Sequence, residues 1–194
     1  MRGFSKTTFV IILLTTLVVV LSISKLTTLV AYAAQTSWLE EAWGQAGAVA
    51  YEAAAKTMLV RNDRGQRSLD NFQKRYLRGN FVNHIDRVSV VYDAQLMDRW
   101  VVGGMSIHLG AVESTAQTYC DRIYLRSTYQ PEDINQLIVL AHEMVHVRQC
   151  QKLGGMKQFG YAYFKAYKRA NQKYEKNKLE KEAFSFQKKF AASL

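Results

Sequence analysis

Residues 141–150 read AHEMVHVRQC and place His142 and His146 four positions apart, with Glu143 directly after the first histidine. On a helix, residues four apart lie on one face, so the two imidazoles can reach one metal ion while Glu143 points beside them. Zinc with three protein ligands lowers the pKa of a bound water to about 7, and a neighbouring carboxylate can take up the proton. The stretch therefore predicts a zinc site (Zn²⁺) with Glu143 as the catalytic base.

Apolar residues surround this motif on nearly all sides of the predicted helix: Leu137, Ile138, Leu140, Ala141, Met144 and Val145. Such a pattern is typical of a buried helix. Buried imidazoles and carboxylates are costly unless they find partners, and a metal ion satisfies all three groups together. The alternative is a pair of hydrogen-bonded core histidines.

The third ligand must come from another segment, because Cys150 lies about 12 Å along the helix from His142 at 1.5 Å per residue. In LEKEAFSFQKKF the apolar face consists of Leu179, Ala183, Phe186 and Phe190. Glu182 lies next to this face and is the preferred ligand, whereas Glu180 points further from it and is the second candidate. In a further alternative, both acids are solvated and pair with neighbouring lysines.

Two other histidines and several tyrosines are weaker candidates. His84 or His108 could complete a three-histidine site, although neither has the spacing of a motif. A tyrosine often donates a hydrogen bond to the oxyanion in such sites, and four lie between the two predicted ligand segments: Tyr161, Tyr163, Tyr167 and Tyr174. The sequence singles out none of them, and their spacing also suits packing.

The elements that must position these residues follow from local signals. Strand-like runs occupy the stretch between Arg87 and Leu125 and predict three or four strands. Helices are expected over Gln35 to about Val60, over Leu69–Leu77 with an end near Gly79, from Pro131 to Gly154-Gly155, over Met156 to about Ala170, and over Leu179–Phe190. The expected fold class is therefore α+β.

The first segment has the pattern of a targeting sequence. Arg2 and Lys6 precede an uncharged apolar run over residues 7–24. Residues 1–33 are predicted to be a signal peptide cleaved after Ala33, or an uncleaved membrane anchor formed by residues 7–24. Both interpretations export the following single domain, residues 35–194, as a secreted, periplasmic or anchored protein.

Charge and cysteine content add two expectations. The formal net charge is +10, and much of the excess lies between Lys165 and Lys189. This favours attraction to an anionic membrane or cell-wall surface, although a solvated face without a partner fits equally; no nucleic-acid recognition motif is present, and no nucleic-acid partner is expected. Cys120 and Cys150 can form a disulfide in an oxidising compartment, the alternative being two buried thiols.

Three stretches, AQTYCDRIYL, LIVLAHEMVHVRQCQKLGG and KLEKEAFSFQ, resemble a family of small bacterial zincin-like metallopeptidases. That family is related to the core peptidase domain found with extracellular contractile injection systems, and the resemblance covers Arg87 to Phe190. It implies a zincin-like fold with a small, mostly antiparallel sheet whose edge strand lies over the cleft. It also implies a glutamate ligand from a later helix, which places Glu182 in that position.

Two functions of different classes follow. The first is an exported zinc metallopeptidase that cleaves protein or peptide substrates, with His142, His146 and Glu182 as ligands. The second is a zinc-stabilised, non-catalytic binding module that docks by its basic surface on membrane, cell wall or a partner protein. Glu143 favours the first, because a purely structural zinc site needs no base beside its ligands.

Overall fold

A computed structural model describes residues 37–97, 99–102, 105–108 and 115–194 of the chain. The predicted signal peptide (residues 1–33) and anchor (residues 7–24) lie outside these residues. Within the described ranges, no helix combines the length and apolarity needed to cross a membrane. The compact unit considered below spans Glu40–Leu194.

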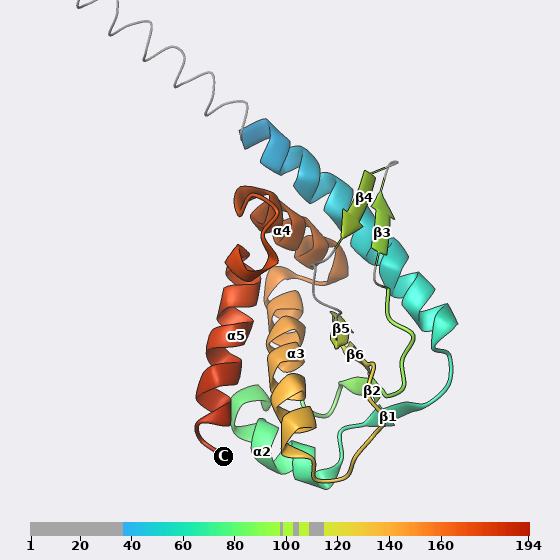
Figure 1. Ribbon diagram of the computed structural model, residues 1–194, viewed down its shortest axis with the longest axis vertical. Helices are drawn as coiled ribbons and strands as arrows, with labels where there is room; N and C mark the ends of the chain where they lie inside the picture. Colours follow the sequence, from blue (N-terminus) through green and yellow to red (C-terminus); the bar gives the residue numbers. More distant parts are fainter. Residues whose placement is uncertain (1–36, 98, 103–104, 109–114) are drawn as a thin grey trace, which may run out of the picture. The chain divides into compact units, whose positions relative to one another are not determined.

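This unit has an α+β fold (Figure 1). Residues 40–61 are helical, in agreement with the first predicted helix. The elements that follow are β1 (Gln66–Ser68), α2 (Asn71–Phe81), β2 (Ser89–Val91), β3 (Arg99–Val102), β4 (Met105–His108), β5 (Ala116–Tyr119), β6 (Arg122–Leu125), α3 (Ile134–Leu153), α4 (Met156–Arg169), the 3₁₀ turn η1 (Tyr174–Lys176) and α5 (Lys178–Ala191).

Four short strands form a mixed sheet in the order β1-β2-β6-β5. The β1–β2 and β5–β6 pairs are antiparallel, whereas β2 and β6 are parallel, with Val90 opposite Ile123. Strands β3 and β4 form a separate antiparallel pair. A small sheet is thus present, as expected, with two of its three strand pairings antiparallel and one parallel, and β5 lies at one of its edges.

Helix α3 occupies the centre of the unit. It contacts β5 and β6 on one side and α5 on another, and it also contacts α2 and α4 (Figure 1). Leu140 and Met144 are completely buried, as the apolar pattern predicts. The helix begins at Ile134 rather than at Pro131, because the Asp133 side chain caps it by accepting a hydrogen bond from the Gln136 backbone N–H at 2.6 Å. Gly154 ends it with a φ of 99°, a left-handed conformation that favours glycine.

Helix α5 runs antiparallel to α3, and its first turn is held against α4 (Figure 1). Asn177 caps α5 and is fully buried. Its side-chain oxygen accepts a hydrogen bond from the Leu179 N–H at 3.1 Å, and its side-chain nitrogen donates to the Tyr163 carbonyl at 3.3 Å. This double contact fixes where the first turn of α5 lies.

Two further elements, α2 and β1, differ from the sequence prediction. Helix α2 continues through Gly79 to Phe81, because Leu77 and Phe81 both point into the core, while Gly79 has open space around it. Strand β1 lies in the stretch RNDRGQRS, outside the stretch from Arg87 to Leu125 in which strands are predicted. Its three residues are all exposed, so they carry no apolar alternation that would mark a strand.

Candidate metal centre

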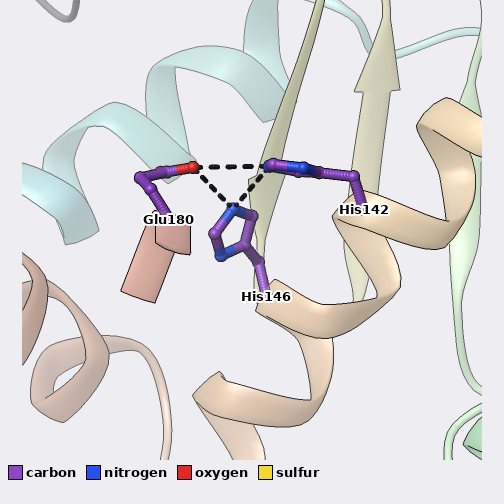
Figure 2. A group of neighbouring side chains, drawn as sticks. All are labelled: His142, His146 and Glu180. Carbon is purple, nitrogen blue, oxygen red and sulfur yellow. Dashed lines mark hydrogen bonds and ion pairs between the residues drawn. The ribbon is translucent and has the colours of Figure 1, made fainter. Parts of the chain in front are cut away.

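Three side chains from α3 and α5 converge on one point (Figure 2). His142 Nε2 lies 3.2 Å from His146 Nε2. The Glu180 Oε2 atom lies 3.3 Å from His142 Nε2 and 3.4 Å from His146 Nε2. The predicted pair of histidines is therefore brought together, and a glutamate of the last helix completes a nearly equilateral triangle.

This triangle has the dimensions that a zinc site requires. Ligand atoms at 2.0–2.1 Å from a tetrahedral zinc ion are about 3.3–3.4 Å from one another. The donor set of two imidazoles and one carboxylate is one that zinc uses in catalytic sites, where three protein ligands leave the fourth position open. The group could hold a metal ion, and its geometry and chemistry fit zinc.

Burial makes a partner for these atoms necessary. His142, His146 and Glu180 are only 6%, 7% and 2% exposed. Glu180 Oε2 is one of two buried side-chain polar atoms that lack a hydrogen-bond partner within the described part of the chain. A buried carboxylate oxygen without such a partner is expensive, and a cation between it and the two imidazoles would remove that cost.

His146 and Glu180 shift each other's pKa. Burial lowers the pKa of His146, but the Glu180 carboxylate beside it outweighs that effect and raises the pKa from 6.5 to about 9. For Glu180, burial raises the pKa, and the charge of protonated His146 outweighs it and lowers the pKa below its ordinary value. A proton on His146 thus supplies the positive charge when no metal is bound.

The preference for Glu182 as the third ligand requires a correction. Glu182 does not reach the histidines; its side chain is 54% exposed and lies 3.3 Å from Arg148. Glu180, the second candidate, takes the place instead. The prediction assumed one packing face on α5, whereas the first turn of α5 packs against both α3 and α4, so the side of the helix that carries Glu180 is also covered.

Several side chains that the motif does not include hold the ligands. The Tyr163 hydroxyl donates a hydrogen bond of 2.6 Å to Glu180 Oε1. The Nδ1 atom of His142 lies 3.0 Å from Gln187 Oε1, and that of His146 lies 2.9 Å from Gln149 Oε1. Sequence reasoning missed both glutamines. Gln187 lies on α5, so its place beside His142 becomes visible only once α3 and α5 are paired, whereas Gln149 lies three residues after His146 on α3 itself.

Glu143 lies on α3 beside the triangle and is buried. Its Oε2 atom accepts a hydrogen bond of 2.7 Å from the Thr118 hydroxyl on β5. The predicted base is thus not a member of the metal-ligating group, and the edge strand of the sheet holds it in place. Glu143 thus lies beside the ligands, as expected from the sequence, and its role as a base stays a prediction.

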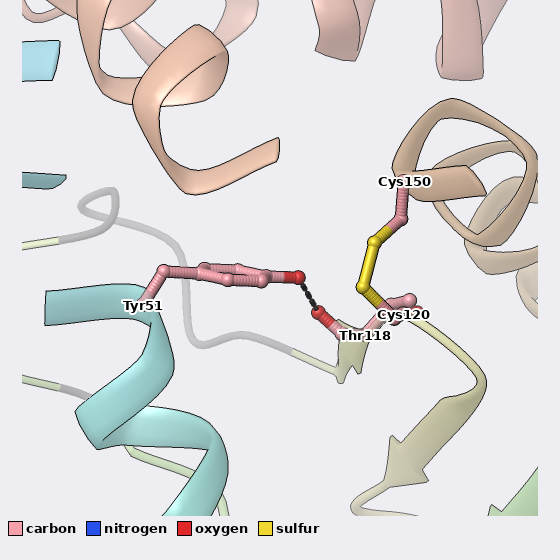
Figure 3. The surroundings of a disulfide bond; sticks show 4 residues. All are labelled: Tyr51, Thr118, Cys120 and Cys150. Carbon is pink, nitrogen blue, oxygen red and sulfur yellow. Dashed lines mark hydrogen bonds between the residues drawn. A yellow bond between two sulfur atoms is a disulfide. The ribbon is translucent and has the colours of Figure 1, made fainter. Parts of the chain in front are cut away.

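A disulfide joins Cys120, directly after β5, to Cys150 in the last part of α3 (Figure 3). The Cα atoms are 5.3 Å apart, so the predicted bridge is confirmed. On the other side of β5, the buried Tyr51 hydroxyl donates a hydrogen bond to the Thr118 carbonyl (Figure 3). The strand segment that contacts Glu143 is therefore fastened to α3 covalently and to the helix of residues 40–61 by a hydrogen bond.

The remaining candidates lie elsewhere or have other contacts. His84 is not part of the metal-ligating group, and the side chain of His108 lies outside the described residues. Tyr161 donates a 2.6 Å hydrogen bond to Glu41, and Tyr167 faces Trp43 with ring centroids 6.2 Å apart. Of the four tyrosines, Tyr163 and Tyr174 lie near the site: burial and the Glu180 carboxylate raise the pKa of both hydroxyl groups.

Comparison with known families gives one match. Residues 69–154 match the family described as the eCIS core domain. The match runs from just before α2 to the end of α3, so it includes His142, Glu143 and His146 but not Glu180. No curated protein and no solved structure matches the chain.

The choice between the two glutamates is testable by metal analysis. We expect Glu180→Ala to weaken zinc binding by about 100-fold or more, because it removes one of three ligands. Glu182→Ala should retain one zinc per chain. Chelator competition followed by elemental mass spectrometry measures both; loss of zinc from Glu182→Ala alone would reverse the assignment.

The charges of the metal-free group predict an unusual pH dependence. Since the pKa of His146 is raised from 6.5 to about 9, its ion pair with Glu180 stabilises the metal-free protein fully below about pH 6.5 and is lost as the pH rises through about 9. Zinc competes with that proton, so stabilisation by zinc should grow over the same interval. Between pH 6.5 and 9, thermal stability should fall in the presence of chelator and stay nearly level with excess zinc, because neither zinc-bound nor unfolded His146 carries the proton there; parallel curves would contradict the pairing.

The disulfide should contribute substantially to stability. It closes a loop with a sequence separation of 30 residues, for which loop-closure entropy predicts about 3–4 kcal/mol. We expect the double variant Cys120→Ala/Cys150→Ala to lose about this free energy of unfolding in urea titrations. Wild type in reducing agent is the matched control and should behave like the variant; if oxidised and reduced wild type unfold at the same urea concentration, the expectation is wrong.

Proposed function

We propose that this chain is an exported zinc-dependent metallopeptidase with a zincin-like fold, in which His142, His146 and Glu180 hold the metal and Glu143 is the general base. The observation that carries the proposal is the buried triangle of Nε2, Nε2 and Oε2 atoms with edges of 3.2–3.4 Å. Glu143, which is not part of the triangle, lies next to it on α3, the helix that carries both histidines.

The roles of the residues follow from their contacts. When bound, zinc supplies a Lewis acid that polarises a carbonyl group and makes water acidic enough to react at neutral pH. Glu143 takes the proton released from the attacking water and passes it to the leaving amine. The Thr118 hydroxyl donates to one oxygen of Glu143 at 2.7 Å, which orients the carboxylate and leaves its other oxygen for the proton.

A protein or peptide substrate fits the position of β5. This strand is the last in the order of the four-stranded sheet, and its Thr118 contacts the base. An extended peptide that pairs with such an edge brings its backbone carbonyls, rather than a side chain, alongside the strand. The match of residues 69–154 to the eCIS core domain adds support, because it ends with the helix that carries the base and both histidines.

The second candidate function is a zinc-stabilised binding module that docks on an anionic membrane or cell-wall surface. The observation in its favour is a set of exposed lysines on α5: Lys178, Lys181, Lys188 and Lys189. Part of the basic excess is already neutralised, since Lys165 and Arg169 each lie 2.6 Å from an acid of the helix of residues 40–61. The presence of Glu143, which a structural site does not need, makes us prefer the peptidase.

The decisive test removes the base and keeps the metal. We expect Glu143→Gln to bind one zinc per chain and to fold as wild type, while turnover of a peptide library falls by about 10²-fold or more, the range for loss of a general base. Zinc content and cleavage are measured on the same preparation. Full activity in Glu143→Gln would refute the mechanism, and a zinc-loaded wild type that cleaves nothing would favour the binding module.

A further inference from the structure

We propose that Gln149 is a positioning residue: it holds His146 in the one tautomer that offers its Nε2 lone pair to the metal, and Glu182 and the Leu179 carbonyl fix the orientation of Gln149. The inference deepens the proposed zinc site and rests on it. It also assigns Glu182 an indirect role, because Glu182 contacts Gln149 and not the metal ligands.

The orientation of the Gln149 amide follows from its neighbours. Its Nε2 atom lies 3.0 Å from the Leu179 carbonyl oxygen and 3.0 Å from Glu182 Oε2. A carbonyl and an ionised carboxylate can only accept hydrogen bonds, so the amide NH₂ group must face them. The amide oxygen of Gln149 must then be the atom that faces His146. The reversed amide would set two pairs of acceptors against each other.

The tautomer of His146 follows in turn. Gln149 Oε1 lies 2.9 Å from His146 Nδ1, and because this oxygen only accepts, Nδ1 must carry a hydrogen atom. A neutral imidazole has one N–H hydrogen, so Nε2 then has a free lone pair. That lone pair belongs to the atom that lies 3.2 Å from His142 Nε2 and 3.4 Å from Glu180 Oε2. Gln149 therefore selects the form of His146 that can bind metal.

Glu182 is itself held in place from the surface. Arg148 Nη2 lies 3.3 Å from Glu182 Oε1, and the Arg148 guanidinium lies 5.3 Å and 5.6 Å from the ring centroids of Phe81 and Phe186. The two oxygens of Glu182 are thus divided between Arg148 and Gln149. A chain of contacts leads from an arginine supported by two aromatic rings, through Glu182 and Gln149, to a metal ligand.

The test compares zinc affinity and the protonation site of the His146 ring in a small set of variants. Gln149→Leu removes the acceptor at similar volume and should weaken zinc binding by about 10–100-fold, the range for loss of a hydrogen-bond partner of a ligating histidine. Gln151→Leu, on an exposed position of the same helix, is the matched control and should bind as wild type. Affinity is measured by chelator competition, with thermal unfolding of the metal-free proteins alongside.

An exchange of the two side chains provides the rescue. In Gln149→Glu/Glu182→Gln, the new carboxylate accepts from His146 Nδ1 and from the new amide, so the acceptor is restored; the rescue is partial, because the Leu179 carbonyl loses the donor that the Gln149 amide supplied. We expect its zinc affinity to lie closer to wild type than that of Gln149→Leu. Equal loss in both variants at equal thermal stability would show that Gln149 only ties α3 to α5.

The imidazole itself gives a readout that packing does not affect. In two-bond ¹H–¹⁵N spectra of zinc-loaded wild type, His146 should show a protonated Nδ1 and a metal-bound Nε2. The opposite pattern would overturn the inference even if Gln149→Leu failed to fold. If wild type binds no zinc, the metal site fails and the inference with it; if wild type binds zinc and Gln149→Leu binds it equally well, only the inference fails.

Discussion

Two imidazole nitrogens and a carboxylate oxygen, all buried and 3.2–3.4 Å apart, are the constraint on which the rest of this fold depends. Each of these atoms carries a lone pair, and water has little access to any of them. Without a positive charge in their midst such a group destabilises the packing of the two helices. Either a proton on His146 or a metal ion can supply that charge, and either one stabilises the packing of α3 against α5.

Residues of several helices and strands hold the three ligand side chains and Glu143 in place. The first turn of α5 must begin at a defined place, and the buried Asn177 ensures this by bonding to both α5 and α4. The Tyr163 hydroxyl then holds one oxygen of Glu180, so that the other faces the histidines. On the opposite side of α3, Thr118 of β5 holds Glu143. Ligands and base are thus fixed from different elements, and each can be perturbed without the other.

The sequence predicted those features that depend on local spacing. The pairing of His142 with His146 follows from the helical repeat alone, and the separate role of Glu143 follows from the chemistry of such a motif. Glu180 could not be chosen over Glu182, because helical periodicity describes one packing face, whereas the start of α5 is covered from two directions. For Gln149, the spacing of three residues places its side chain beside His146 on α3, but the orientation of its amide is set by Leu179 and Glu182 on α5, which the sequence does not pair with it.

The chain also carries two cross-links that close successive loops. The disulfide joins residues 120 and 150, and a metal ion held by His146 and Glu180 would join two positions a similar distance apart in the chain. The disulfide spans residues 120–150 and the metal ligands span residues 142–180, so they share only residues 142–150 and constrain largely separate stretches, and their contributions to stability should be nearly additive. One cross-link depends on oxidation and the other on metal supply. The unit could therefore lose either one and keep the constraint of the other, so that each of two unrelated chemical conditions governs one of the two constraints.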